Sequence, residues 1–176
     1  QSGRRLLLFG HPSFIKATAM NPIRIHDFTL SGHAHRVRLF CSLLGLPVEL
    51  HPVNLRGGEQ KSPDFLAKNP FGQVPVIEDG DVTMADSNAI LLFLADREKR
   101  FVPLDAASPA RANMLSWLMF IASGIGPFSG QAVHFQHYAP EKIPYAINRY
   151  DFEAWRHWNL IEAQLARHPW MLGDRY

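Results

Sequence analysis

Two short polar segments of this chain have residue types that can bind or activate an anion. Ser31 lies between a predicted first strand and the helix after it, and Asp86-Ser87 stand just before a second apolar helix. Free N–H groups at a helix N-terminus attract anions. A carboxylate and a hydroxyl beside them suit the ammonium and carboxylate of an amino acid. A hydroxyl that donates to a thiolate favours the charged form of the thiol, whose pKa is otherwise about 8.5.

Simpler structural roles exist for the same residues. Taken alone, Ser31 fits a plain helix cap better than a ligand-binding role. No GxSxG pattern surrounds it that would indicate a nucleophile. Asp86-Ser87 is also suited to be an N-cap pair, with Ser87 capping the helix that contains Leu91. Capping and ligand binding use different atoms, so both roles are open at this point.

Other reactive residue types favour structural roles. Four histidines have short spacings, namely His33, His35, His134 and His137. No cysteine or carboxylate accompanies them at ligand spacing, so no metal is expected. Cys41 falls on the apolar face of a predicted helix, where core packing is the expected role. The tryptophans Trp117, Trp155, Trp158 and Trp170 lie on helical stripes and are expected in the core or in a pocket wall.

Composition excludes several classes of partner. The chain has 176 residues and a net charge of +2 from 18 basic and 16 acidic side chains, which is too balanced to indicate nucleic acid or an anionic membrane. A single cysteine excludes an internal disulfide. No apolar run approaches the ~20 residues that span a bilayer. The apolar run after Arg4-Arg5 is too short for a signal peptide, and residues 1–21 are expected to be a disordered extension.

The pattern of residues 22–100 predicts a small α/β domain. Strands are expected at residues 23–28, 48–55, 73–77 and 82–84, and helices at 34–44, after Ser62, and at 87–97. The order β-α-β-α-β-β-α requires one parallel strand pair, and a hairpin around Asp79-Gly80 adds an antiparallel strand. This mixed sheet is the thioredoxin-like layout.

Residues 101–107 are predicted to link this domain to an all-helical one at residues 108–176. Ser108 is expected to cap a helix over residues 110–123, which Gly124, Gly126 and Pro127 should break. A second helix is expected over residues 147–167. Its apolar stripe comprises Ile147, Tyr150, Ala154, Trp158, Ile161 and Leu165.

Three strings, taken together, resemble a known family. Residues 69–90 read NPFGQVPVIEDGDVTMADSNAI, residues 31–36 read SGHAHR, and residues 59–63 read EQKSP. They resemble the glutathione-binding half of glutathione transferases, most closely the serine-type phi and zeta members of plants and bacteria. The resemblance covers about Ile23 to Tyr176. Such proteins continue into further helices, so the helical domain is expected to be incomplete and the chain to be truncated at its C-terminus.

The resemblance implies roles for three polar residues that precede the third predicted strand. Ser31, five residues before Arg36, would be the catalytic serine that donates to the sulfur of glutathione. Gln60 and Lys61 would hold the glycyl carboxylate. The family usually has histidine where Gln60 stands, and Lys61 alone would suit a solvated surface equally well.

The rest of the glutathione site is implied in the same way. Gln73 and Val74 precede the position of a cis-proline, Pro75, and the Val74 backbone would pair with the cysteinyl part. Asp86, where the family more often has glutamate, and Ser87 would bind the γ-glutamyl end.

The expected protein is therefore a cytoplasmic, homodimeric glutathione S-transferase with a role in detoxification. It would activate the thiol of glutathione, its cosubstrate, for attack on a small electrophilic hydrophobic substrate. Two alternatives remain open: a glutathione-dependent isomerase or dehalogenase, and a non-catalytic binding protein with the same fold.

Overall fold

The computed structural model describes residues 21–174, so the extension predicted at residues 1–21 lies outside the described residues except for Asn21. The first half of the chain contains four strands. They are β1 (Ile23–Asp27), β2 (Val48–Pro52), β3 (Val76–Asp79) and β4 (Val82–Ala85). Its helices are α1 (Gly32–Leu44), the short 3-10 turn η1 (Glu59–Lys61), α2 (Pro63–Lys68) and α3 (Ser87–Glu98). We call residues 23–98 the sheet half.

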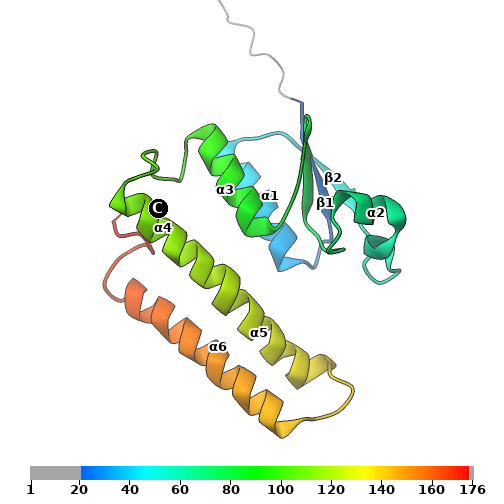
Figure 1. Ribbon diagram of the computed structural model, residues 1–176, viewed down its shortest axis with the longest axis vertical. Helices are drawn as coiled ribbons and strands as arrows, with labels where there is room; N and C mark the ends of the chain where they lie inside the picture. Colours follow the sequence, from blue (N-terminus) through cyan, green and yellow to red (C-terminus); the bar gives the residue numbers. More distant parts are fainter. Residues whose placement is uncertain (1–20, 175–176) are drawn as a thin grey trace, which may run out of the picture.

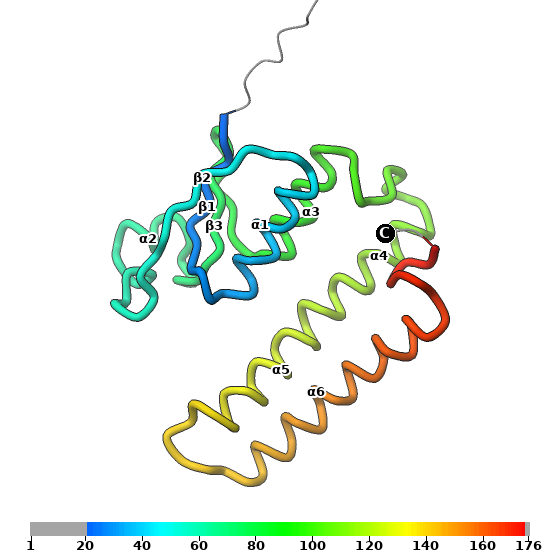
Figure 2. Tube along the Cα trace, turned by 180° about the vertical axis from the view of Figure 1, so that it is seen from behind, coloured from blue at the N-terminus to red at the C-terminus, as the bar shows by residue number. Residues whose placement is uncertain are grey.

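The strands form one mixed sheet in the order β2-β1-β3-β4 (Figure 1). β1 and β2 are parallel, whereas β3 is antiparallel to both β1 and β4. Helices α1 and α3 cover one face of the sheet, and α2 lies on the other (Figures 1 and 2). The predicted thioredoxin-like fold is confirmed. The second strand ends at Pro52 instead of residue 55, and the third begins at Val76 instead of residue 73.

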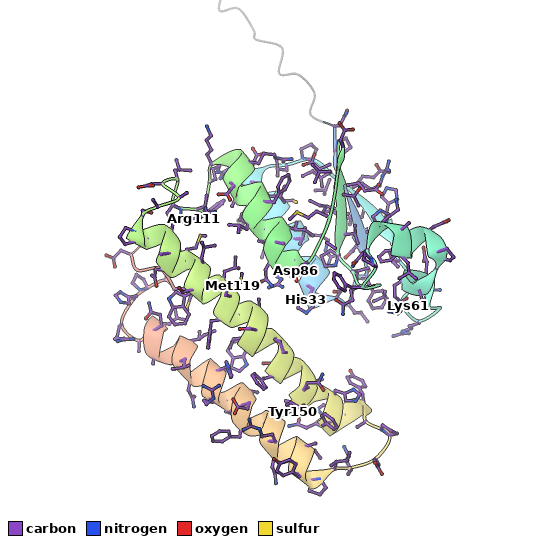
Figure 3. The ribbon with its side chains drawn as sticks, viewed as in Figure 1. His33, Lys61, Asp86, Arg111, Met119 and Tyr150 are labelled. Atoms are coloured by element: carbon purple, nitrogen blue, oxygen red, sulfur yellow. The ribbon has the colours of Figure 1, made fainter. Side chains whose placement is uncertain are left out.

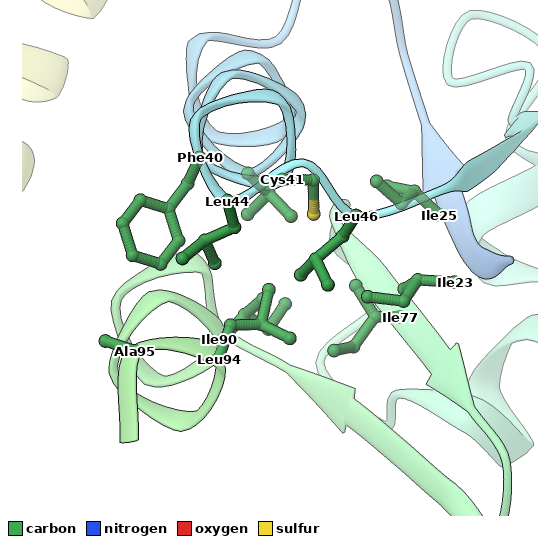
Figure 4. Packing of buried hydrophobic residues seen from close by; sticks show 11 residues of the cluster. Ile23, Ile25, Phe40, Cys41, Leu44, Leu46, Ile77, Ile90, Leu94 and Ala95 are labelled. Carbon is green, nitrogen blue, oxygen red and sulfur yellow. The ribbon is translucent and has the colours of Figure 1, made fainter. Parts of the chain in front are cut away.

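The core of the sheet half lies between the sheet and helices α1 and α3 (Figure 4). Alternating strand residues such as Ile23 and Ile25 point into it, and so do helix residues at a spacing of three or four. The buried cluster comprises Ile23, Ile25, Val37, Phe40, Cys41, Leu44, Leu46, Ile77, Ile90, Leu94 and Ala95. Cys41 is fully buried there, as expected.

Three serines cap helices where the sequence predicts helix starts. The hydroxyl of Ser31 accepts from the backbone N–H of Ala34, Ser62 does so from Phe65, and Ser108 from Arg111. These side chains satisfy N–H groups that have no partner inside the helix. The caps therefore fix where α1, α2 and the first helix of the second half begin.

The second half of the described chain is helical. It comprises α4 (Pro109–Phe120), α5 (Gly126–Val133) and α6 (Pro144–Leu165), with π-helical turns η2 (Ile121–Ile125) and η3 (His134–Tyr138) after α4 and α5. We call residues 109–165 the helical half. Helices α5 and α6 pack side by side, and the chain runs through α4 and α5 as one long rod (Figure 1).

The predicted helix break at Gly124, Gly126 and Pro127 is wrong. The π-helical turn absorbs the irregularity: the N–H of Gly126 donates to the carbonyl of Ile121, five residues back. Pro127 then lies in the first turn of α5, where its ring is tolerated. The helix therefore continues through all three residues.

Helix α6 leaves part of its apolar stripe uncovered. Ala154 is buried, but 48% of Trp158 and 42% of Leu165 remain exposed. They border a groove of about 710 Å³ between α5 and α6, which Val133 and Trp155 also line. No helix in residues 21–174 is long and apolar enough to cross a membrane.

Candidate functional site

A pocket of about 390 Å³ opens where the N-termini of α1 and α3 meet the loop before β3. All but one of the predicted site residues line it, and the exception is Lys61. The predicted residues in its wall are Ser31, Gln60, Gln73, Val74, Pro75, Asp86 and Ser87. Further wall residues, which the sequence analysis did not place in this site, are His33, Leu55, Asn69, Phe71 and Gly72.

Ser31 reaches the pocket as the cap of α1. Its Oγ accepts from the N–H of Ala34 at 3.2 Å. That bond uses a lone pair of the hydroxyl and leaves its proton free to be donated. Ser31 is therefore the cap of α1, and its hydroxyl proton remains available for a second hydrogen bond.

Asp86 caps α3 from a strained backbone conformation. Its φ is 65° and its ψ is 118°, a region that costs a non-glycine residue roughly 1–3 kcal/mol. The carboxylate Oδ1 accepts from the N–H groups of Asn88 at 2.8 Å and Ala89 at 3.0 Å. The cap of α3 is thus Asp86, and Ser87 is already the first helical residue. The two bonds hold the carboxylate at the pocket wall.

Arg36 connects the two helix N-termini across the site. Its Nε donates to Oγ of Ser87 and its Nη1 to Oδ1 of Asn88, each at 2.9 Å, and its Nη2 also bonds to Ser87. Ser87 and Asn88 are buried. Burial lowers the pKa of Arg36, which the Asp86 carboxylate partly offsets. These contacts leave no local signature in the sequence, because the partners of Arg36 on α3 are about fifty residues away.

His33 lies beside this arginine at the start of α1. Its Nδ1 is 3.1 Å from Nη2 of Arg36 and 3.4 Å from Oγ of Ser87. Burial lowers its pKa, and the Arg36 guanidinium lowers it further. Figure 3 shows His33 and Asp86 near one another on the side of the sheet half that faces α4 and α5. No cluster of three metal-binding side chains occurs in residues 21–174.

The opposite wall of the pocket is the loop before β3. Asn69 is buried and orders this loop by accepting from the N–H of Phe71 and donating to the carbonyl of Gln73. The Val74-Pro75 peptide bond is cis, as the resemblance implied. The loop therefore presents its backbone to the pocket next to Val74.

Gln60 and Lys61, at the end of η1, lie against this loop. The Nζ of Lys61 donates to the carbonyl of Phe71 at 3.4 Å. Gly72 has a φ of 61°, and a Cβ there would lie 2.7 Å from Nζ of Lys61 and 2.8 Å from the Gln60 carbonyl. Only glycine fits this approach. Oε1 of Gln60 is buried without a hydrogen-bond partner in the described chain.

Comparison with known proteins decides the family. Residues 30–97, which contain every residue discussed in the pocket, match the family model described as "Glutathione S-transferase, N-terminal domain". Glutathione S-transferase 1 of Schizosaccharomyces pombe is 36% identical over 85% of this chain and 70% of its own length. Disulfide-bond oxidoreductase YfcG of Escherichia coli is 35% identical over 85% of this chain and 72% of its own. The chain belongs to the glutathione transferase family.

Solved structures of this family agree with the fold. The glutathione transferase URE2P6 of Phanerochaete chrysosporium, in complex with oxidized glutathione, has a TM-score of 0.82 and 32% identity. That match covers 87% of this chain and 72% of the other. A family member from Pseudomonas fluorescens with two glutathione bound has a TM-score of 0.84 at 29% identity, covering 92% and 73% of the two chains.

The pocket holds no protein thiol. The only cysteine of the chain, Cys41, is buried in the core of the sheet half. Burial raises its pKa to about 11, which keeps it a thiol at neutral pH.

Proposed function

We propose that this pocket binds glutathione and that the chain is a serine-type glutathione transferase. One observation carries the proposal: Ser31, Val74 and Asp86 line the same pocket. The hydroxyl of Ser31 keeps a proton to donate, and the Asp86 carboxylate is held in place by backbone N–H groups. A donor for a thiolate and an acceptor for an ammonium are the two groups that this tripeptide requires.

The tripeptide would lie along the pocket in one direction. Its γ-glutamyl ammonium would meet Asp86, and the carboxylate of the same group would meet the N-terminus of α3 at Ser87. The cysteinyl backbone would pair with Val74. The glycyl carboxylate would then reach the amide of Gln60 and the ammonium of Lys61, both of which can donate hydrogen bonds to it.

In the transfer reaction, Ser31 would donate a hydrogen bond to the sulfur of glutathione. A lowering of the thiol pKa by about 2 units corresponds to ~2.7 kcal/mol and makes most of the thiol a thiolate at neutral pH. The thiolate would attack an electrophilic carbon of a small hydrophobic substrate and form a thioether, while the leaving group departs with the bonding pair. From the family resemblance alone, we also propose that the protein is located in the cytoplasm, forms a homodimer and has a role in detoxification.

A second candidate function is glutathione-dependent reduction of disulfides. It is favoured by the names of the relatives YfcG and YghU, both disulfide-bond oxidoreductases of Escherichia coli, although this chain spans only 44% of YghU. Because Cys41 is buried, two glutathione molecules would supply both electrons. The first thiolate displaces one thiol from the disulfide, and the second attacks the mixed disulfide to give oxidized glutathione and the other thiol.

The test compares Ser31→Ala with Ser108→Ala, which removes an equivalent helix cap far from the pocket. Each change should lower stability by about 0.5–2 kcal/mol. Only Ser31→Ala should raise the apparent pKa of bound glutathione and slow turnover at neutral pH, with glutathione affinity nearly intact because one neutral hydrogen bond contributes ~0.5–1.5 kcal/mol.

Activity is measured against an aromatic halide, a mixed disulfide of glutathione, and an isomerisable or haloalkane substrate. The substrate that turns over selects among the enzymatic functions. Glutathione binding without any turnover would select the non-catalytic alternative. An identical pH–rate profile in Ser31→Ala and the unmodified protein would contradict the role of Ser31.

A further inference from the structure

We infer that His33 is a second hydrogen-bond donor to the sulfur of bound glutathione, through its Nε2–H. The inference rests on the proposed glutathione site and adds to it a residue that the serine mechanism does not use.

The neighbours of Nδ1 fix which ring nitrogen carries the proton. Nη2 of Arg36 lies 3.1 Å from Nδ1, and a guanidinium only donates hydrogen bonds. Nδ1 must therefore offer its lone pair, and a neutral His33 carries its proton on Nε2. The Ser87 hydroxyl, 3.4 Å from Nδ1 and itself an acceptor for Arg36, has its own proton free for the same lone pair.

The surroundings of His33 favour the neutral form of its ring. Partial burial lowers the pKa of His33, and the adjacent Arg36 cation lowers it further, although the Asp86 carboxylate opposes both. Protonation would require a second N–H on Nδ1, which would point at the guanidinium. Desolvation and the Arg36 cation therefore both favour the neutral form of His33, which carries a single ring N–H.

The place of His33 in the pocket wall makes Nε2 available to a ligand beside Ser31. The contacts with Arg36 and Ser87 use Nδ1 and leave Nε2 without either partner. His33 follows Ser31 by two residues at the start of α1, and both line the pocket. A thiolate at the Ser31 hydroxyl would therefore receive two neutral donors, each of which favours the charged form.

The first experiment tests the tautomer without any ligand. The protein is labelled with ¹⁵N-histidine, and the ring nitrogens are correlated with the ring protons by NMR at neutral pH. The His33 resonances are identified by their loss in His33→Asn. We expect a protonated Nε2 and an unprotonated Nδ1. A His33 signal with the proton on Nδ1, or a fully averaged pattern, would overturn the inference.

The second experiment measures the pKa of bound glutathione from the ultraviolet absorbance of its thiolate, together with glutathione affinity. His33→Leu removes the donor, whereas His33→Asn keeps an N–H. His35→Leu is the matched control, because His35 is an exposed histidine of the same helix outside the pocket wall. We expect His33→Leu to raise the thiol pKa by up to about one unit, a tenfold change in the thiolate-to-thiol ratio. His33→Asn should restore part of it, and His35→Leu should change nothing.

The outcomes separate this inference from the proposed function. Glutathione that fails to bind the unmodified protein would refute the proposed function, and the inference with it. Normal binding with a lowered thiol pKa that His33→Leu leaves unchanged would refute the inference alone. A loss of affinity without a change in the thiol pKa would also refute it, since His33 would then contact another part of the tripeptide.

Discussion

Arg111 on α4 holds Asp96 on α3 through a two-pronged ion pair. Nη1 and Nη2 of the guanidinium lie 2.7 Å and 2.8 Å from the two carboxylate oxygens. This geometry is the strongest available between these groups. The pair fastens the first helix of the helical half to the last helix of the sheet half, so it bears on how the two halves hold together.

Loss of this pair should weaken the protein in a pH-dependent way. The bond from Arg111 lowers the pKa of Asp96. The stabilisation is therefore complete above the pKa of an unfolded aspartate, about 3.9, and disappears as pH falls through the lower folded value. Asp96→Asn should lower Tm at neutral pH, and the difference should shrink below about pH 4. Glu141→Gln, in an exposed loop, is the control; a difference that persists unchanged in acid would contradict the assignment.

Glu78 on β3 should contribute more than Asp96 to the stability that the fold loses when the pH is lowered. The Lys68 ammonium, helped by Arg24 at 2.9 Å and with the His26 ring at 3.4 Å, lowers its pKa from 4.5 to about 2. A depressed carboxylate pKa stabilises the fold above the unfolded value and loses that effect as pH falls through the folded one. Thermal melts of Glu78→Gln should show a deficit that is constant above about pH 5 and fades toward pH 2. Equal deficits at pH 7 and pH 2 would show that the ion pairs are not its cause.

Gly124 should be irreplaceable because His157 occupies the space beside it. A Cβ at Gly124 would lie 2.4 Å from Cδ2 and 2.6 Å from Nε2 of His157. That ring is buried and packed against Phe120 and Phe128, at centroid distances of 5.2 Å and 4.8 Å, so it has little room to move. Gly124→Ala should destabilise by roughly 1–3 kcal/mol in urea unfolding.

Gly130, in α5, is the matched control for Gly124. A Cβ there meets nothing within 4 Å, and alanine favours a helix over glycine by about 0.8–1.0 kcal/mol. Gly130→Ala should be neutral or stabilising. If the two variants unfolded alike, helix propensity and not the His157 contact would explain the result.

Asp86 should recognise the ammonium of glutathione by charge. Asp86→Asn keeps an oxygen that can cap α3 but removes the negative charge. A hydrogen bond to a charged group contributes about 1.5–3 kcal/mol, so we expect glutathione affinity to fall about tenfold or more in calorimetry. Cysteinylglycine, which lacks the γ-glutamyl group, should bind the variant and the unmodified protein equally. A similar loss for both peptides would contradict this role.

The sequence predicted local chemistry better than long-range contacts. Ser31, Ser62 and Ser108 were identified as caps because a cap depends on a few consecutive residues. Asp79-Gly80 marked the hairpin for the same reason. By contrast, the fork of Arg36 on Ser87 and Asn88 requires two helices to meet and leaves no local signature.

Other errors have equally physical causes. Gly124 and Pro127 are residue types that usually break a helix. Here Gly124 lies in a π-helical turn and Pro127 lies in the first turn of α5, so the helix continues. The sequence singles out His33 only as one of four closely spaced histidines for which no metal is expected. Its place in the pocket wall depends on Arg36, which stands one turn later on α1.

The distribution of two residue types gives each half of this molecule its own natural reporter. Trp117, Trp155, Trp158 and Trp170 all follow residue 108, whereas the only thiol, Cys41, is sealed inside the sheet half. Intrinsic tryptophan fluorescence therefore reports unfolding of the helical part of the chain. The rate at which a thiol reagent modifies Cys41 reports unfolding of the sheet half. Both signals come from the unmodified chain, so coincident or separate transitions would reveal directly whether the two halves unfold as one cooperative unit.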